Sequence, residues 1–414
     1  MAIMIDRQLK NICFSEQFGR QMRFIVGPRQ TGKTMLAKER LTQSGCEKLY
    51  YNWDKRDIRQ AYRKESHFFA ADLYNVAASA DKPWICFDEF HKMPRWKNIL
   101  KDIFDSFEDK CRFIVTGSAR LDLLKYTGES LLGRYFTFRL FPLRLIEVIG
   151  GLNPPAKPPM ESLQFVDAAL SSQKNAGEGF EQLLKLGGFP EPFVSGLDEF
   201  VRRWRHDYCA NFIKEDLRDL THIAEIENTL QLIDILPGRV GSPLSLNSLR
   251  EDMEVSHTAV RNWLRALKLT HVIFFLRPYS KKIARSVKKE AKCYLFDWGR
   301  VDDPAARFEN YVAVELKGLA SFMTDAGWGE FELLYVRTRD GKETDFLITH
   351  DKKPWLLFEA KLSEENIETH HIRNAQQLGD IPFVQLTRRT GVFKVIENRY
   401  FAVSAERFLA NLPV

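Results

Sequence analysis

The segment GPRQTGKT, from Gly27 to Thr34, has the residue types and spacing of a loop that binds phosphate. It matches the pattern GxxxxGK[ST] at every fixed position. In such a loop the backbone N–H groups point toward phosphate oxygens, the lysine reaches the β- and γ-phosphates, and the last hydroxyl binds Mg²⁺. We therefore expect ATP and Mg²⁺ as cofactors, with Lys33 on the phosphates and Thr34 on the metal. The other loop residues expected to contact the nucleotide are Gly27, Pro28, Arg29, Gln30, Thr31 and Gly32.

Two adjacent carboxylates, Asp88 and Glu89, follow the apolar run WICF at residues 84–87. Ligands bind at the carboxyl ends of the strands in a parallel sheet, so a buried strand here delivers both acids to the nucleotide. We expect Asp88 to hold Mg²⁺ and Glu89 to polarise the attacking water. Adjacent acids are also common in ordinary loops after strands. The phosphate-binding loop earlier in the chain favours the catalytic interpretation.

A further strand end and one arginine are candidates to complete this site. The run RFIVTGSAR at residues 112–120 places Ser118, or alternatively Thr116, where a hydroxyl can contact the γ-phosphate or orient the water. A serine that only satisfies a turn is an equally good interpretation. Arg134, in LLGRYF, is a candidate to stabilise charge on the nucleotide of a neighbouring subunit, and a solvated surface arginine is the alternative.

The C-terminal part of the chain contains a second set of carboxylates, in the spacing D-x13-E-x-K. Glu359 and Lys361 lie two residues apart after the apolar run WLLF, so both side chains project from the same face of a strand. If this strand pairs with the preceding one as a hairpin, Asp345 joins them. Two carboxylates beside a lysine can hold Mg²⁺ and orient water for hydrolysis. A charged hairpin without chemistry is the alternative.

The positive charge is concentrated in residues 239–300, which contain thirteen Lys and Arg and five Asp and Glu, a net charge of +8. The rest of the chain sums to −2, because the whole chain carries +6. Such a concentrated patch favours a polyanion such as DNA as the partner, and protein contacts are the alternative.

The same stretch has the order of elements found in a winged helix. A helix from Leu246, a turn, a second helix over 258–267 and the strand HVIFFL are followed by a basic run and the strand CYLFD. Ser256 is expected to cap the second helix, with Val260, Leu264 and Leu267 as its buried stripe. The residues expected to contact DNA are His257, Arg261, Asn262 and Arg265 on the outer face of that helix, and Lys281, Lys282, Arg285, Lys288 and Lys289 in the wing.

The chain has 414 residues, of which 44% are hydrophobic and 28% charged, a composition typical of folded soluble proteins and not of disordered chains. No apolar run reaches the roughly 18–20 residues that span a bilayer, and the N-terminus does not resemble a secretory signal. Six cysteines are scattered singly, which suits reduced thiols. We therefore expect a cytoplasmic protein with no membrane partner.

The motifs GPRQTGKT, FDEFHKMPRW, TGSAR, ESLLGRYFTFRLFPL and GGFPEP occur in this order. With them, nearly the whole chain resembles the prokaryotic AAA+-type ATPases that bear a C-terminal domain of unknown function. The resemblance implies an α/β fold, in which a P-loop ATPase with a parallel sheet and a helical lid precedes a winged helix and a restriction-endonuclease-like domain. AAA+-like enzymes often form rings, so a homo-oligomer with ATP is a further expectation. The positions matching the family's nucleotide site are Lys33, Thr34, Asp88, Glu89 and Ser118.

The second carboxylate set resembles the PD-(D/E)XK nucleases, in which an acid from a preceding helix often joins the site. Glu309 matches that acid and Gln376 matches a commonly seen glutamine, whereas Thr344 stands where the name-giving motif has proline. The resemblance implies Asp345, Glu359 and Lys361 as catalytic residues, and Glu309, Asp345 and Glu359 as metal ligands.

Four segments follow from these observations: an ATPase domain over 1–150, a helical lid or connector over 151–238, a winged helix over 239–300 and a nuclease-like domain over 301–414. Three functions stay open. The first is an ATP-dependent DNA-processing enzyme that cleaves DNA with Mg²⁺. The second is a nucleotide-controlled DNA-binding or signalling ATPase with an inactive nuclease fold. The third is a remodeller of protein partners.

Overall fold

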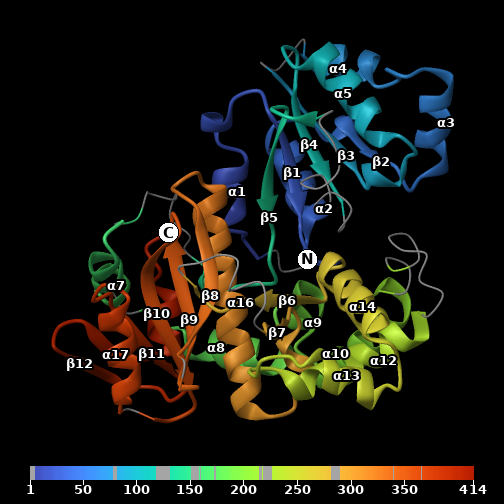
Figure 1. Ribbon diagram of the computed structural model, residues 1–414. Helices are drawn as coiled ribbons and strands as arrows, with labels where there is room; N and C mark the ends of the chain where they lie inside the picture. The colour runs from blue at the N-terminus through green and yellow to red at the C-terminus, as the bar shows by residue number, and fades with distance from the viewer. Residues whose placement is uncertain are drawn as a thin grey trace. The chain divides into compact units, whose positions relative to one another are not determined.

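The computed structural model of the chain is shown in Figure 1. It describes residues 5–77, 82–117, 131–150, 158, 160–171, 174–213, 217, 226–280, 290–338, 340–364 and 366–414. The chain divides into two compact units, Arg7–Phe141 and Pro142–Val414, the second also including the residues up to Asp6. The four segments expected from the sequence therefore stay predictions, because 142–414 form one compact unit.

The Arg7–Phe141 unit is built on a five-stranded parallel sheet in the order β2-β3-β4-β1-β5. The inner strands are almost continuously buried runs, as expected for a sheet covered on both faces. This confirms the α/β class with a parallel sheet. The two edge strands were not predicted, because one is very short and the other is only partly buried. The strands are β1 (Met22–Val26), β2 (Tyr50–Asn52), β3 (Trp84–Asp88), β4 (Arg112–Thr116) and β5 (Tyr135–Arg139).

Helices connect β1 to β2, β2 to β3 and β3 to β4, as parallel pairing requires. Helix α5 shows why they form, because its buried residues Leu100, Ile103, Phe104 and Phe107 recur at the three- and four-residue spacing of one helix face. The helices of this unit are α1 (Leu9–Cys13), α2 (Lys33–Gln43), α3 (Arg56–Lys64), α4 (Ala70–Ala77) and α5 (Trp96–Phe107).

The Pro142–Val414 unit begins with helices and contains a helix–turn–helix followed by a hairpin. Ser256 caps the second helix, its Oγ accepting a hydrogen bond of 3.1 Å from Ala259 N. The hairpin strands pair in antiparallel fashion. The helices are α6 (Leu145–Val148), α7 (Ser162–Leu170), α8 (Gly177–Leu186), α9 (Pro190–Ser195), α10 (Asp198–Asp207), α12 (Ile226–Ile235), α13 (Leu246–Asp252) and α14 (His257–Leu269), and the strands are β6 (Ile273–Leu276) and β7 (Lys292–Leu295).

The C-terminal part of this unit is a mixed six-stranded sheet in the order β12-β13-β11-β10-β9-β8. Helix α16 (Pro304–Asp325) packs along β8, β9 and β10 (Figure 1), and most of its residues are buried. Two shorter helices, α17 (Thr369–Gln377) and α18 (Ala405–Ala410), also pack against the sheet. The strands are β8 (Phe331–Arg337), β9 (Glu343–His350), β10 (Lys353–Lys361), β11 (Phe383–Thr387), β12 (Phe393–Ile396) and β13 (Tyr400–Ser404).

Strands β9 and β10 form an antiparallel hairpin, in which Phe346 lies opposite Phe358. Asp351 and Lys352 at its tip both have positive φ, 48° and 66°, as a two-residue turn that matches the twist of the strands requires. Asp345 and Glu359 are the next residues on the two strands, on the side of the Phe pair away from the turn. The hairpin therefore brings these two acids together. Of the described helices, none is both long enough and apolar enough to cross a membrane.

Candidate functional site

The phosphate-binding loop lies between β1 and α2, where the chain leaves the carboxyl end of a central strand. Gly27 has φ +143°, and a Cβ at this position would lie 2.1 Å from Leu140 O on β5's side of the sheet. Gly32 has φ +96° and directly precedes the first residue of α2. Both positions therefore require glycine, which explains the two fixed glycines of the motif.

Lys33 is buried, and its Nζ donates hydrogen bonds to Gly27 O at 3.0 Å and to Pro28 O at 2.6 Å. The ammonium thus lies over the loop whose N–H groups are expected to bind phosphate. Thr31 Oγ1 donates to Pro28 O at 2.9 Å, and this bond closes the loop on itself. This arrangement suits a bound triphosphate, because the N-terminus of α2 and the lysine charge both lie at the loop that follows β1.

Asp88 joins three elements at the end of β3. Its Oδ2 accepts hydrogen bonds from Thr34 Oγ1 at 3.0 Å and from Tyr50 OH at 2.5 Å, and its Oδ1 accepts one from the Thr116 hydroxyl. The Thr34 hydroxyl and the Asp88 carboxylate are thus adjacent, and oxygen ligands of this kind are those that Mg²⁺ prefers. The residues present therefore fit a Mg²⁺ ion bound with the nucleotide.

Glu89 follows Asp88 in the left-handed backbone region, with φ 56°. Its N–H donates to Thr116 O at 3.1 Å, which fixes the turn after β3 beside the end of β4. Burial of the side chain, together with the neighbouring Asp88 carboxylate, raises the pKa of Glu89 to about 7, while Lys33 opposes the rise. A carboxyl with a pKa near neutrality is suited to accepting a proton from water.

Sequence reasoning missed two residues of this site. Arg7, from before α1, donates to Thr31 O at 2.5 Å and to Phe141 O at 2.5 Å, so a buried guanidinium braces the loop. Tyr50, on the unpredicted strand β2, holds Asp88. Neither belongs to a recognisable motif, and both reach the site only through the fold. Ser118, predicted to contact the γ-phosphate, lies outside the described residues.

Arg134 lies at the other end of the sheet from the phosphate-binding loop. It directly precedes β5, which runs parallel to β1, whereas the loop follows β1. The guanidinium makes two hydrogen bonds to Asp105 on α5, from Nε at 2.7 Å and from Nη2 at 3.0 Å. Arg134 therefore does not face a nucleotide bound to the phosphate-binding loop of its own chain. Its role toward a neighbouring subunit stays a prediction.

The outer face of α14 carries the four residues predicted to contact DNA, His257, Arg261, Asn262 and Arg265, and all are exposed. Val260, Leu264 and Leu267 are buried beneath them, as expected from the helical spacing. The exposed face borders a groove of about 790 Å³ that is also lined by Lys268 and Arg277.

Basic side chains outnumber acidic ones in the lining of this groove, which also includes Glu290 and Glu332. In the described part of the chain no carboxylate pairs with Arg261, Arg265 or Arg277. Burial, and to a lesser extent the neighbouring charge of Arg277, lower the pKa of Lys268. The predicted wing residues Lys281, Lys282, Arg285, Lys288 and Lys289 lie outside the described residues.

The second carboxylate set assembles where the β9–β10 hairpin faces α16. Asp345 N donates to Glu359 Oε2 at 3.0 Å, and Ala360 N donates to Asp345 Oδ2 at 3.3 Å. Lys361 Nζ lies 3.1 Å from Glu359 Oε1. Glu309 approaches from α16, and its Oε1 accepts a hydrogen bond of 2.7 Å from Tyr294 OH.

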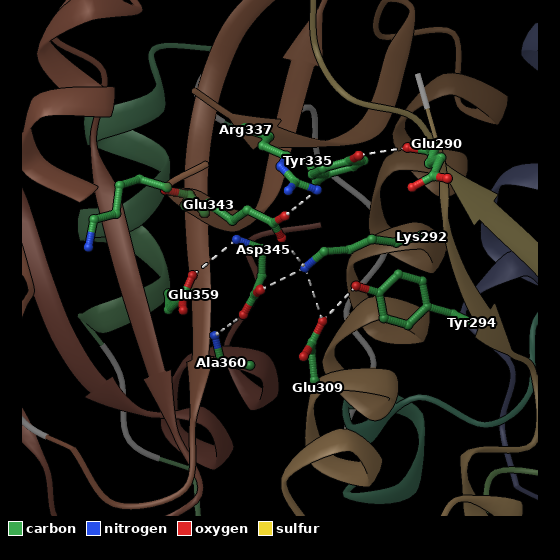
Figure 2. Close-up of polar contacts among 12 residues, drawn as sticks. Glu290, Lys292, Tyr294, Glu309, Tyr335, Arg337, Glu343, Asp345, Glu359 and Ala360 are labelled. Carbon is green, nitrogen blue, oxygen red and sulfur yellow. Dashed lines mark hydrogen bonds and ion pairs between the residues drawn. The ribbon is translucent and has the colours of Figure 1, made fainter. Parts of the chain in front are cut away.

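A buried lysine that sequence reasoning did not single out lies at the centre of these acids. Lys292, the first residue of β7, is 1% exposed. Figure 2 shows its Nζ between Asp345, Glu309 and Glu343, at 3.0, 3.5 and 3.4 Å from their nearest oxygens. Burial alone would lower the pKa of Lys292, but these three carboxylates raise it above its usual value, so the ammonium stays charged.

The carboxyls are perturbed by the same crowding. Burial and the Asp345 charge raise the pKa of Glu309 to about 7, against the opposing effect of Lys292. The same two causes raise the pKa of Glu359 well above its usual range. With an ammonium among them, the acids as arranged do not fit a divalent cation. Gln376, matched to the nuclease motif, is exposed on α17, whereas His371 and Asn374 are the buried polar residues of that helix.

Family models match two parts of the chain. Residues 19–149 match a family described as an AAA domain, and residues 177–301 match a domain of unknown function, DUF8612. The first match includes the phosphate-binding loop, Asp88 and Glu89, so the Arg7–Phe141 unit contains an AAA-type P-loop ATPase domain. The second match includes α14 and Lys292 and names no activity.

Similar proteins are also found among curated sequences and solved structures. Uncharacterized proteins of Mycobacterium bovis and Mycobacterium tuberculosis are each 25% identical over 358 residues, which is 85% of this chain and 72% of theirs. The Aeropyrum pernix ORC1 protein in complex with DNA is 14% identical, with a TM-score of 0.31 over 76% of this chain and 94% of that chain. The replication initiator DnaA bound to AMPPCP and single-stranded DNA is 16% identical, with a TM-score of 0.29 over 63% of this chain and 84% of that chain. At these TM-scores neither structure bears on the function of this chain.

Proposed function

We propose that this chain hydrolyses ATP with Mg²⁺ and binds duplex DNA through the helix–turn–helix and hairpin of residues 246–295, used as a winged helix. The contact between Thr34 Oγ1 and Asp88 Oδ2, at 3.0 Å, carries the ATPase part. These two residues are far apart in the sequence, and their meeting beside the phosphate-binding loop gives the metal two adjacent oxygen ligands.

Each residue of the nucleotide site has a separate task. The loop N–H groups and Lys33 bind the triphosphate, and Thr34 and Asp88 hold the metal, which neutralises phosphate charge when bound. Glu89 orients the attacking water and accepts its proton, a task that its pKa of about 7 supports. Tyr50 and Arg7 position the acid and the loop.

The DNA-binding part rests on the charge of the α14 face. Arg261 and Arg265 are exposed on one side of a helix whose other side is buried, so both can enter a DNA groove without unfolding anything. Arginine forms bidentate hydrogen bonds with base edges and with phosphates. Because the groove beside them is also lined by Lys268 and Arg277, a polyanion is the partner that its charge favours.

We expect the double substitution Arg261→Ala, Arg265→Ala to weaken binding to a labelled duplex by about 10-fold or more, and to reduce the salt slope by about 2. The measurement is fluorescence anisotropy at several salt concentrations. Arg202→Ala, Arg203→Ala is the matched control, since both are exposed on α10 and the change in charge is the same. Equal affinity losses in both double variants, or no loss in the first, would contradict the assignment of α14.

Cleavage of DNA by the C-terminal domain is the second candidate, favoured by the hairpin that brings Asp345 beside Glu359. The ammonium of Lys292 among the same acids opposes it, so we favour binding without cleavage. We expect no nicking of supercoiled plasmid by the wild-type protein with ATP and Mg²⁺, measured on agarose gels. Cleavage that Asp345→Ala abolishes would overturn this preference and support the nuclease. Cleavage that Asp345→Ala leaves intact would place the activity elsewhere.

A further inference from the structure

The ammonium of Lys292 lies at the point where three carboxylates from two elements converge (Figure 2). Asp345 and Glu343 alternate along β9 and so share a face, and Glu309 comes from α16. Lys292 Nζ donates a hydrogen bond of 3.0 Å to Asp345, and it lies at ion-pair distances of 3.4 Å from Glu343 and 3.5 Å from Glu309.

Each of these acids also has a second partner that fixes its direction. Tyr294 OH donates to Glu309 at 2.7 Å, Arg337 lies 3.2 Å from Glu343, and Ala360 N donates to Asp345 at 3.3 Å. The carboxylates are therefore held toward a common point independently of Lys292. A common point surrounded by oriented carboxylate oxygens is also the arrangement that a hard divalent cation requires.

An ammonium and a metal ion cannot occupy this point together. Mg²⁺ needs oxygens at roughly 2.0–2.1 Å in near-octahedral geometry, and a lysine nitrogen among the ligands supplies a positive charge where a lone pair is required. Lys292 is buried, and its strand is held in the β6–β7 hairpin by pairing of Leu276 with Lys292 itself. The β6–β7 hairpin therefore holds the Lys292 backbone in place, and the positive charge of the side chain is a fixed part of the fold.

We propose that Lys292 is the resident cation of this cluster, which occupies the position of a divalent metal and keeps the cluster metal-free. The lysine neutralises acids that would otherwise repel one another, and it ties β7 to the C-terminal sheet. Removal of its charge converts Glu309, Glu343 and Asp345 into an open divalent-cation site. The inference does not rest on the ATPase or on DNA binding, since it concerns this cluster alone.

The test is binding of Mn²⁺ to the full chain without nucleotide, counted from the loss of the free Mn²⁺ signal in electron paramagnetic resonance. We expect Lys292→Ala to bind one Mn²⁺ per chain more than the wild type. Lys292→Arg keeps the charge and should bind no more than the wild type. Adding Asp345→Asn to Lys292→Ala should abolish the extra site, which places it at this cluster and not at the phosphate-binding loop.

Thermal unfolding of the same proteins gives a second readout. Breaking a buried ion cluster by removing one partner is strongly destabilising, so Lys292→Ala should unfold about 5–10 °C below the wild type. MnCl2 should restore at least about half of that loss, and none in the double variant, because a ligand stabilises only the state that binds it. If Lys292→Ala cannot be isolated, Lys292→Gln removes the charge at smaller structural cost and takes its place.

Two results would overturn the inference. An equal number of Mn²⁺ ions in the wild type, in Lys292→Arg and in Lys292→Ala means that the lysine does not occupy a cation position. The absence of extra Mn²⁺ and of any Mn²⁺-dependent stabilisation in the charge-removing variant means that the acids form only a buried ion cluster. Either result leaves the proposed ATPase untouched, whereas loss of ATP hydrolysis would leave the inference untouched.

Discussion

Replacing Lys33 with alanine is expected to lower ATP hydrolysis by about 10²–10³-fold or more, to the background of the assay. The side chain supplies the only lysine of the phosphate-binding loop, and its ammonium lies over the loop through bonds to Gly27 O and Pro28 O. Without it the β- and γ-phosphates lose their main protein cation both when ATP binds and as charge moves during cleavage. ATP affinity should therefore fall together with turnover.

The measurement is phosphate release over a range of ATP concentrations, with binding followed separately by calorimetry. Lys64→Ala is the matched control, since Lys64 is exposed on α3 and the change in charge is identical. Unchanged thermal unfolding in both variants separates lost chemistry from lost folding. Hydrolysis by Lys33→Ala at the wild-type rate would refute the assignment of the loop.

Replacing Glu89 with glutamine is expected to separate binding from chemistry. Glutamine has nearly the same shape but cannot accept the proton of the attacking water, so turnover should fall by about 10²–10⁴-fold while ATP still binds. The loop, Thr34 and Asp88 are unchanged in this variant, and the backbone bond from Glu89 N to Thr116 O is retained. The expected signature is a loss in kcat with little change in ATP affinity.

Single-turnover hydrolysis and calorimetric binding of ATP measure the two effects on the same preparation. Glu47→Gln, at an exposed position, is the control for the loss of one carboxylate charge. If Glu89→Gln lost ATP binding as severely as Lys33→Ala, Glu89 would be part of the binding site and not the group that activates water. A wild-type rate would remove it from the mechanism altogether.

The parts of the sites that are local in sequence could be predicted, and those assembled by the fold could not. The loop Gly27–Thr34 is contiguous, and Asp345 and Glu359 belong to strands joined by a two-residue turn, so spacing alone indicated both. The outer face of α14 could also be predicted from the sequence, because Val260, Leu264 and Leu267 mark the buried side of the helix.

Lys292 shows the limit of that reasoning. It begins a strand three residues after the lysine pair 288–289, where a solvated surface residue is the ordinary expectation. Its partners, Glu309 on α16 and Asp345 on β9, come from other elements, and only the packing of the hairpin against the C-terminal sheet buries it. Tyr50 and Arg7 were missed for the same reason. The alternation of Lys292 and Tyr294 on one apolar strand was the only available signal.

The steady-state rate of ATP hydrolysis with and without duplex DNA shows whether the nucleotide site and the α14 face work together. If the chain is an ATPase that works on DNA, saturating duplex should raise the wild-type rate at least severalfold. The Arg261→Ala, Arg265→Ala protein should keep the basal rate but lose the stimulation, and Lys33→Ala should hydrolyse nothing under either condition. A wild-type rate that duplex DNA leaves unchanged, with stimulation by a protein partner in its place, would contradict the account.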